Sequence, residues 1–238
     1  MSALHPHRAA AHAHRRPRKI ALFGGSFDPV HVGHLAVARA AERRFHLDEV
    51  YFIPSGRPPH KHRHILAPFP HRYAMVALAC ADHPTFLPSL AEAGTDMSGR
   101  QVFYSIETVR HFRRLFHQPD DRLFFILGAD SFLEIPTWKE YAALLGACDF
   151  IVASRPGFRT EALRLVVPPE LLGRPPARGG AADRRAIALR RTTAYLLDTV
   201  ASDVSATEVR RRLRQGQSIH GLVPPRVEEY ICKQALYR

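Results

Sequence analysis

The sequence has few cysteines, and none of them are closely spaced. Its 238 residues include three cysteines, Cys80, Cys148 and Cys232, which lie far apart in apolar sequence and form no C-x-x-C motif. Disulfide-stabilised secreted scaffolds and thiolate zinc sites both depend on closely spaced cysteines. We therefore exclude these two classes and expect buried structural thiols.

Long apolar runs are also missing. No run approaches the roughly 20 residues that a membrane helix needs, and no apolar segment follows the basic N-terminus as a signal peptide requires. A hydrophobic content of 46% and a charged content of 24% are ordinary for a soluble globular protein. We therefore expect a cytoplasmic protein that does not enter a membrane, with one α/β domain and an appended element.

Acidic residues are scarce relative to basic ones. The chain has 22 Asp and Glu against 34 Lys and Arg, a formal net charge of +12. A basic surface binds nucleic acids, but an anionic nucleotide also favours a positive cleft, so charge alone leaves both interpretations open. Much of the basic sequence lacks apolar periodicity. We expect residues 1–18 to be a disordered basic tail and residues 158–191 to be an exposed insertion.

What the chain does contain is a phosphate-binding pattern near its start. An apolar run at residues 20–23 ends at Gly24-Gly25, and a helical pattern begins after Pro29, so the segment predicts a strand, a glycine turn and a helix. Glycines let backbone N–H groups approach an anion, and a helix start offers further N–H donors. His31 and His34 can lie on one face of that helix start and point at the same phosphate.

The remaining pattern predicts a doubly wound, mainly parallel α/β sheet. Ligands bind beyond the carboxyl ends of the strands in such sheets. We expect further strands at residues 50–53, 85–90, 122–127, 150–153 and 195–200, and helices near 33–45, 70–82, 106–117 and 138–145.

A second helix start follows the last predicted strand. Ser205 and Glu208 have the spacing of a capping box, which predicts a helix with Ser205 as its N-cap. Residues 203–238 should form a C-terminal helical appendix. A plain capping box also explains these two residues without any ligand.

Several of these segments together resemble one enzyme family. His31-Val32-Gly33-His34 is similar to the H-x-G-H signature of the nucleotidyltransferase superfamily, and the preceding Gly24 to Pro29 resembles the bacterial nicotinate mononucleotide adenylyltransferases most. Further matches are Pro58 to Lys61, Gly128 to Asp130 with Trp138, Arg155 to Gly157, and Val204 to Thr207 with Arg210. The resemblance covers nearly all of residues 20–235 apart from the insertion, and implies a Rossmann-like domain over 19–202 with 203–238 completing the ATP site.

The resemblance implies a reaction and a set of residues. The reaction would be adenylyl transfer from ATP to nicotinate mononucleotide, giving deamido-NAD and pyrophosphate in NAD biosynthesis. Mg²⁺ would be held mainly through ATP phosphates, without dedicated protein ligands. His34 and His31 would be the catalytic residues. The implied ATP-binding residues are Gly24, Gly25, Ser26, Phe27, His31, Gly33, His34, Arg155, Ser205, Thr207 and Arg210; those for the mononucleotide are Gly25, Ser26, Phe27, Lys61, Tyr104, Ser105, Asp130 and Trp138.

Some details depart from the family pattern. Phe103, Ser105 and Glu107 replace a serine, a threonine and an aspartate, so the pyridine-ring pocket is not defined by the match. Ser105 could instead be a helix N-cap, and Trp138 a half-buried anchor.

Three alternatives remain open for the whole chain. The first is another nucleotidyltransferase, with phosphopantetheine or nicotinamide mononucleotide as acceptor. The second is a basic nucleic-acid-binding protein. The third is metal binding through His60, His62 and His64, which alternate on one face of an extended segment. The oligomeric state, including a homo-oligomer, is also open.

Overall fold

The computed structural model describes residues 16–56, 66–94, 103–154, 158–173, 185–198 and 203–238. Most of the predicted tail, residues 1–15, lies outside the described residues. Arg18, at the end of that predicted tail, is ordered against the domain: its backbone N–H donates to Asp121 at 2.9 Å, and its guanidinium lies 3.6 Å from the same carboxylate. The packed domain therefore begins before residue 19.

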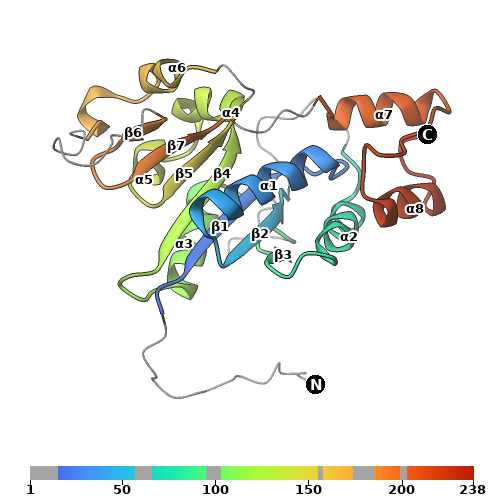
Figure 1. Ribbon diagram of the computed structural model, residues 1–238, viewed down its shortest axis with the longest axis horizontal. Helices are drawn as coiled ribbons and strands as arrows, with labels where there is room; N and C mark the ends of the chain where they lie inside the picture. Colours follow the sequence, from blue (N-terminus) through green and yellow to red (C-terminus); the bar gives the residue numbers. More distant parts are fainter. Residues whose placement is uncertain (1–15, 57–65, 95–102, 155–157, 174–184, 199–202) are drawn as a thin grey trace.

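The described residues form one seven-stranded sheet in the order β3-β2-β1-β4-β5-β7-β6 (Figure 1). Neighbouring strands are parallel except for β6, which runs antiparallel at the edge. The strands are β1 (Lys19–Gly25), β2 (Glu49–Pro54), β3 (Phe86–Pro88), β4 (Arg122–Gly128), β5 (Asp149–Ala153), β6 (Ala186–Ala188) and β7 (Thr193–Leu197). The predicted doubly wound α/β fold is confirmed.

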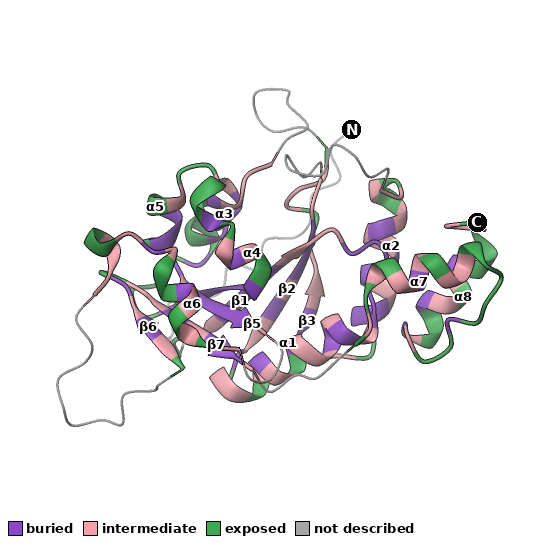
Figure 2. Cartoon of the chain, turned by 90° about the horizontal axis from the view of Figure 1, so that it is seen from above, coloured by how far each residue is buried: buried purple, intermediate pink, exposed green. Residues whose placement is uncertain are grey.

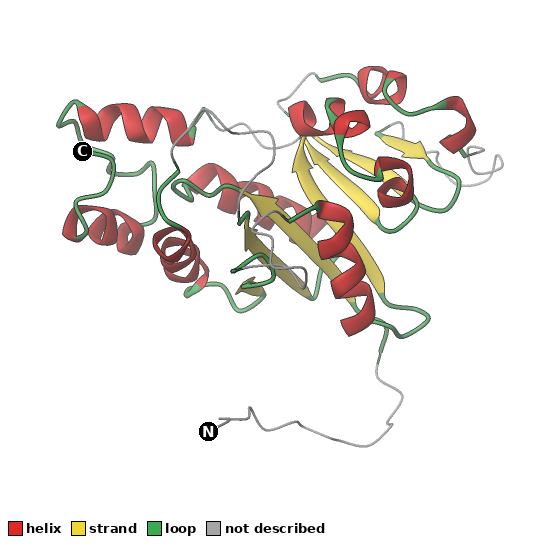
Figure 3. Ribbon diagram, turned by 180° about the vertical axis from the view of Figure 1, so that it is seen from behind, coloured by secondary structure: helices red, strands yellow, loops and turns green. Residues whose placement is uncertain are grey.

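Helices cover both faces of this sheet (Figure 3). They are α1 (Val32–Phe45), α2 (Phe69–Cys80), α3 (Ser105–Leu115), α4 (Ala129–Leu133), α5 (Tyr141–Leu145), α6 (Thr160–Leu165), α7 (Ala206–Arg214) and α8 (Pro225–Lys233), with 3₁₀ turns at Ile135–Thr137 and Pro169–Leu171. None of the helices in the described ranges is long and apolar enough to cross a membrane.

Two hydrophobic cores lie on the two faces of the sheet, as the buried strands and inward helix faces of Figure 2 show. Successive residues of a strand point to opposite faces. In β1, Ile20 and Leu22 pack with α3, α4, α5 and α6, whereas Ala21 and Phe23 pack with α1, α2, α7 and α8. The C-terminal helices α7 and α8 therefore share a core with α1 and lie beside α2 (Figure 1).

Two sequence predictions about elements are wrong in detail. The helix expected from residue 138 starts at Tyr141, because Trp138 is extended and Glu140 has a left-handed φ of 49°. Cys232 is exposed, although Cys80 and Cys148 are buried as expected.

The exposed insertion expected over residues 158–191 does not hold for the described parts of that range. Helix α6 and strand β6 lie within it, and the side chains of Leu163, Val167, Ile187 and Leu189 are buried in the core beside α4. These apolar side chains pack this part of the range against the sheet instead of leaving it exposed. Residues 174–184 lie outside the described residues.

Candidate active site

The turn after β1 places two aromatic rings beneath the start of α1. Phe27 is buried and adopts a φ of 45°, in the left-handed region that non-glycine residues rarely occupy. Its ring packs edge-on against Phe23 and His34, with centroids 5.5 and 5.0 Å away. A Cβ on Gly25 would lie 3.1 Å from this ring, so the glycine permits the close fold-back. Strain at such a position commonly accompanies a functional turn.

His31 and His34 stand together at the first turn of α1. Their ring centroids are 3.7 Å apart, and the backbone N–H of His31 donates to Nδ1 of His34 at 3.2 Å. Because Nδ1 of His34 accepts, the proton of its neutral ring is on Nε2. Nε2 of His34 is therefore a hydrogen-bond donor. Nδ1 of His31 is buried and finds no partner among the described residues.

Burial keeps both imidazoles neutral. It lowers the pKa of His31 from 6.5 to about 4. Burial also lowers the pKa of His34 well below its usual range, and the neighbouring His31 charge lowers it further. Both rings are consequently uncharged near pH 7 and act as neutral donors beside the helix N-terminus.

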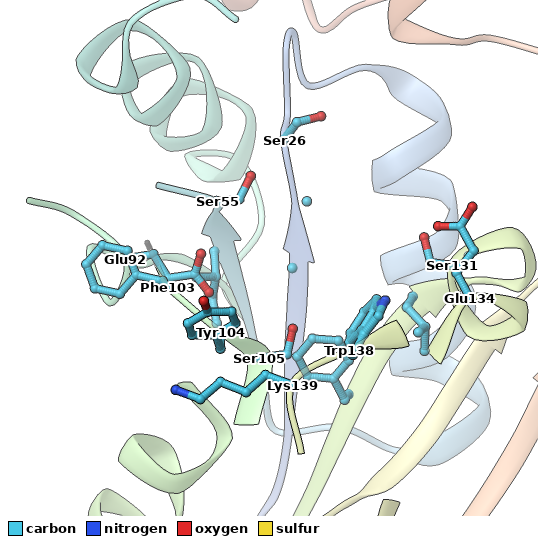
Figure 4. A pocket seen from close by; sticks show the side chains of 16 residues that line it. Ser26, Ser55, Glu92, Phe103, Tyr104, Ser105, Ser131, Glu134, Trp138 and Lys139 are labelled. Atoms are coloured by element: carbon cyan, nitrogen blue, oxygen red, sulfur yellow. The ribbon is translucent and has the colours of Figure 1, made fainter. Parts of the chain in front are cut away.

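A cavity of about 240 Å³ opens beside this turn, at the carboxyl ends of β1, β2 and β4. Figure 4 shows Ser26 at one end of it and Tyr104, Ser105 and Trp138 at the other. The described lining residues are Gly24, Gly25, Ser26, Ile53, Ser55, Glu92, Phe103, Tyr104, Ser105, Phe125, Leu127, Gly128, Ser131, Glu134, Trp138 and Lys139. The position matches the edge where open α/β sheets bind ligands.

Aromatic side chains give the cavity a flat apolar wall. Trp138 is half-buried and packs edge-on against Phe125, with centroids 6.4 Å apart. This packing fixes the indole while leaving it on the cavity wall (Figure 4). A flat ligand ring can stack on such a surface. Ser105 is the first residue of α3, and the residue in the N-cap position is Tyr104, so the alternative of Ser105 as N-cap is wrong.

Three charged lining residues, Glu92, Glu134 and Lys139, were missed by the sequence analysis. Lys139 lies over the Tyr104 ring at 4.3 Å and pairs with Glu107 at 2.6 Å. Glu92 accepts from the Thr108 hydroxyl at 2.8 Å and from the Gly56 N–H at 3.3 Å, and burial raises its pKa. Lys139 directly follows Trp138, which was its only sequence signal. Glu92 lies outside every segment for which a strand or helix was predicted.

The predicted second helix start is confirmed at α7. Ser205 is its N-cap, and its hydroxyl accepts from the Glu208 N–H at 3.2 Å. Arg210 reaches back to the turn after β1, where its Nη1 donates to the Asp28 carbonyl at 2.5 Å. Its Nη2 donates to the Thr207 hydroxyl, within α7, at 3.4 Å. The structure thus brings Arg210 and Thr207 to the turn that precedes His31.

Two buried polar residues near this turn were also missed. Asp28 is 2% exposed, and Arg72 of α2 is 2% exposed. The Arg72 guanidinium donates to three backbone carbonyls, those of Ser26 at 2.8 Å, Ala67 at 2.9 Å and Gly56 at 3.1 Å. It thereby ties the turn after β1 to the segment after β2. An arginine in a helical pattern gives no sign of such burial.

Not every predicted site residue comes to the cavity. Asp130 is exposed on the first turn of α4 and is not among the residues that line the cavity, whereas its neighbours Gly128 and Ser131 are. Gly33 is buried within α1 and is not among the residues that line the cavity. Lys61 and Arg155 lie outside the described residues.

The described residues contain no cluster of three or more His, Cys, Asp or Glu side chains that could hold a metal ion. His60, His62 and His64, the alternative metal ligands, lie outside the described ranges. The donors that surround the first turn of α1 are neutral imidazoles and backbone groups. This set suits an anion, whereas Mg²⁺ prefers oxygen ligands.

Comparisons with known proteins identify relatives of this chain. Residues 22–212 match the family model described as cytidylyltransferase-like. A protein of Moorella thermoacetica named probable nicotinate-nucleotide adenylyltransferase is 40% identical over 223 residues, covering 94% of this chain and 93% of its own length. One with the same name from Geobacter metallireducens is 38% identical, covering 91% and 96%.

The chain belongs to the nicotinate-nucleotide adenylyltransferase family.

Solved structures of this family share the fold. The Plasmodium falciparum nicotinic acid mononucleotide adenylyltransferase complexed with NaAD superposes with a TM-score of 0.66 at 19% identity, covering 92% of this chain and 97% of that one. A Vibrio parahaemolyticus structure described as a putative nicotinate-nucleotide adenylyltransferase gives a TM-score of 0.58 at 17% identity, covering 93% and 96%. The family resemblance drawn from the sequence motifs is therefore confirmed.

Proposed function

We propose that this chain catalyses adenylyl transfer from ATP to nicotinate mononucleotide, forming deamido-NAD and pyrophosphate in NAD biosynthesis. The family to which the chain belongs supports this reaction. The observation that carries it is a pair of neutral histidines at a helix start, 3.7 Å apart, next to a cavity with an aromatic wall. One part suits a phosphate and the other a flat ring.

In this reaction a phosphate oxygen of the mononucleotide attacks the α-phosphorus of ATP. The bond from that phosphorus to the oxygen bridging to the β-phosphate breaks, and pyrophosphate leaves with its electron pair. Such transfers depend mainly on alignment and on stabilising developing negative charge. The residues named above have the donors for both tasks.

His34 has the position of the main donor. Its Nε2–H can bond to an α-phosphate oxygen, and the N-terminus of α1 adds partial positive charge. Because burial holds the imidazole neutral, His34 donates this bond without exchanging a proton with solvent. His31 orients it through its backbone N–H and lies against its ring.

The two ends of the site would bind different parts of the substrates. Trp138, Tyr104 and Ser105 would hold the pyridine ring in the cavity, and Ser26 with the Gly24–Gly25 backbone would hold the mononucleotide phosphate. Arg210 and Thr207 of α7 would neutralise the leaving pyrophosphate. Bound Mg²⁺, held by the ATP phosphate oxygens, would supply further charge neutralisation.

Measuring pyrophosphate release from ATP in parallel with several acceptors tests this proposal. Nicotinate mononucleotide, nicotinamide mononucleotide and phosphopantetheine would be compared at equal concentrations, with ATP alone as the blank. We expect the highest kcat/KM with nicotinate mononucleotide. Release confined to phosphopantetheine, or none above the blank, would contradict the proposal.

A further inference from the structure

The carboxylate of Asp28 is surrounded by groups of this chain rather than open to a ligand. Its Oδ1 accepts from the Tyr237 hydroxyl at 2.7 Å and from the Ala67 N–H at 3.1 Å, and its Oδ2 lies 3.7 Å from Nη1 of Arg210. The Asp28 side chain is 2% exposed. These partners come from three segments that are far apart in sequence.

Asp28 is therefore poorly suited to touch the substrate itself. A carboxylate repels phosphate oxygens, and both of its oxygens already face protein groups. Its position three residues before His31 nevertheless sets it beside the phosphate turn. Asp28 can still affect the reaction indirectly, because it holds the side chain of Arg210.

Arg210 is held on two sides at the same turn. The Asp28 backbone carbonyl accepts from its Nη1 at 2.5 Å, and the Asp28 carboxylate attracts the same nitrogen. The Arg210 side chain is 22% exposed, so these contacts do not enclose it fully. The direction in which the Arg210 guanidinium points therefore depends on the position of Asp28.

Tyr237 is the group that holds Asp28 from the C-terminal side. Its hydroxyl donates to Oδ1, and burial followed by this hydrogen bond raises its pKa, which keeps the phenol protonated as the donor. Tyr237 also has a left-handed φ of 64° and packs on the core shared by α1, α7 and α8. A left-handed non-glycine residue requires surrounding contacts to hold it.

We propose that Tyr237 is a positioning residue for ATP, which sets the guanidinium of Arg210 through the carboxylate of Asp28. The inference rests on the proposed function, because it takes Arg210 to bind the phosphates of ATP. Tyr237 is not among the residues that line the cavity. Its removal should therefore affect ATP and leave the mononucleotide site unchanged.

The first test compares two tyrosines of the same C-terminal segment. Tyr237→Phe removes only the hydroxyl that reaches Asp28. Tyr230→Phe is the matched control, because the Tyr230 hydroxyl pairs with Nδ1 of His71 at 2.9 Å, on the side of α2. We expect Tyr237→Phe to raise the Kd of Mg²⁺–ATP, measured by calorimetry, about tenfold, as for a lost hydrogen bond to a charged group.

The control and the second substrate separate positioning from general stability. Tyr230→Phe should leave the Kd of ATP within about twofold, and Tyr237→Phe should leave the KM for nicotinate mononucleotide within about twofold. Thermal unfolding midpoints of both variants would be recorded. If both variants weaken ATP binding in proportion to their lost stability, Tyr237 has only a structural role and the inference is wrong.

A double-mutant cycle tests whether Tyr237 acts through Arg210. Arg210→Ala alone should weaken ATP binding more than Tyr237→Phe does. Adding Tyr237→Phe to Arg210→Ala should then change the Kd by less than about twofold. A further tenfold loss in the double variant would overturn the inference.

The binding measurement also separates this inference from the proposed function. If the wild-type chain binds ATP but releases no pyrophosphate with nicotinate mononucleotide, the proposed function fails and the cycle can still be measured. If turnover is confirmed and the cycle is additive, only the role of Tyr237 fails.

Discussion

Helices α1 and α7 both begin at the site, but their N-terminal residues differ in charge and in the hydrogen bonds that they already make. At α1 the N-cap is His31, the first turn of this fully described helix has no acidic residue, and the two imidazoles are neutral. At α7 the Ser205 hydroxyl already accepts an N–H, and Glu208 lies in the first turn.

Glu208 disfavours anion binding at the N-terminus of α7. Hydrogen bonds from Arg211 and Arg212 lower its pKa to about 2, so it is negatively charged at neutral pH. Negative charge at a helix N-terminus offsets the dipole that would attract phosphate. The first start thus offers mainly ring donors, since the Val32 N–H already donates to the Leu222 carbonyl at 3.0 Å, whereas the second contributes mainly the side chains of Arg210 and Thr207. The predictions below test this division.

The largest effect should come from the first start. His34→Ala removes the Nε2–H donor, and we expect kcat to fall about 100- to 1000-fold, as for the loss of one transition-state donor, with a smaller change in the Kd of ATP. His220→Ala is the matched control, because this histidine is 84% exposed and pairs with Glu228 away from the turn. Steady-state pyrophosphate release measures both. An unchanged kcat in His34→Ala would remove this residue from the mechanism.

A medium effect should appear in stability at acid pH. The folded pKa of His31 is about 4 and its unfolded value is 6.5, so the unfolded chain binds more protons between these values and stability falls as pH decreases through this window. The shift corresponds to on the order of 3 kcal/mol by pH 4. Urea unfolding of the wild type at pH 7.5 and pH 4.5 should show this loss.

His31→Gln supplies the comparison for that measurement. The variant should lose less of its free energy of unfolding than the wild type over the same pH interval, because glutamine binds no proton. His220→Gln, altered at an exposed histidine, should lose as much as the wild type. Equal losses in all three proteins would show that His31 does not titrate as its burial implies.

The smallest effect should come from the second start. Ser205→Ala removes a side-chain cap, which should lower the free energy of unfolding by about 1 kcal/mol. Because the hydroxyl is already used by the helix, the KM for ATP should rise by less than about threefold. Ser205→Asp would restore the cap and serves as the control for stability. A rise in KM of tenfold or more in Ser205→Ala would mean that the hydroxyl binds phosphate directly, and the division between the two starts would then fail.

The sequence predicted both helix starts because each depends on neighbouring residues. A strand, a glycine pair and two histidines three positions apart define the first, and a serine three positions before a glutamate defines the second. The continuous burial of the central strands was also visible locally, as uninterrupted apolar runs. The mainly parallel arrangement was predicted because strands joined by helices have few arrangements, but the order of the strands in the sheet came only from the structure.

The missed residues depend on contacts between distant segments. Arg72 reaches Ser26 across 46 positions, and Tyr237 reaches Asp28 across 209. Neither contact produces a periodic pattern in the sequence from which it could be predicted. Asp130 stays a prediction: it stands in a matching motif, but its position on the first turn of α4 leaves its side chain exposed, while Ser131 lines the cavity. A motif gives the segment and does not by itself give the rotation of each side chain.

The bond between Asp28 and Tyr237 also has a consequence for the order of folding. Joining residues 209 positions apart requires that the intervening chain has already collapsed, because closing a long unstructured loop costs entropy. Local units such as β1 and α1 can form earlier, since their contacts are close in sequence. The chain should therefore acquire its sheet before its complete phosphate site. ATP binding, monitored during refolding, would report the last step of that sequence.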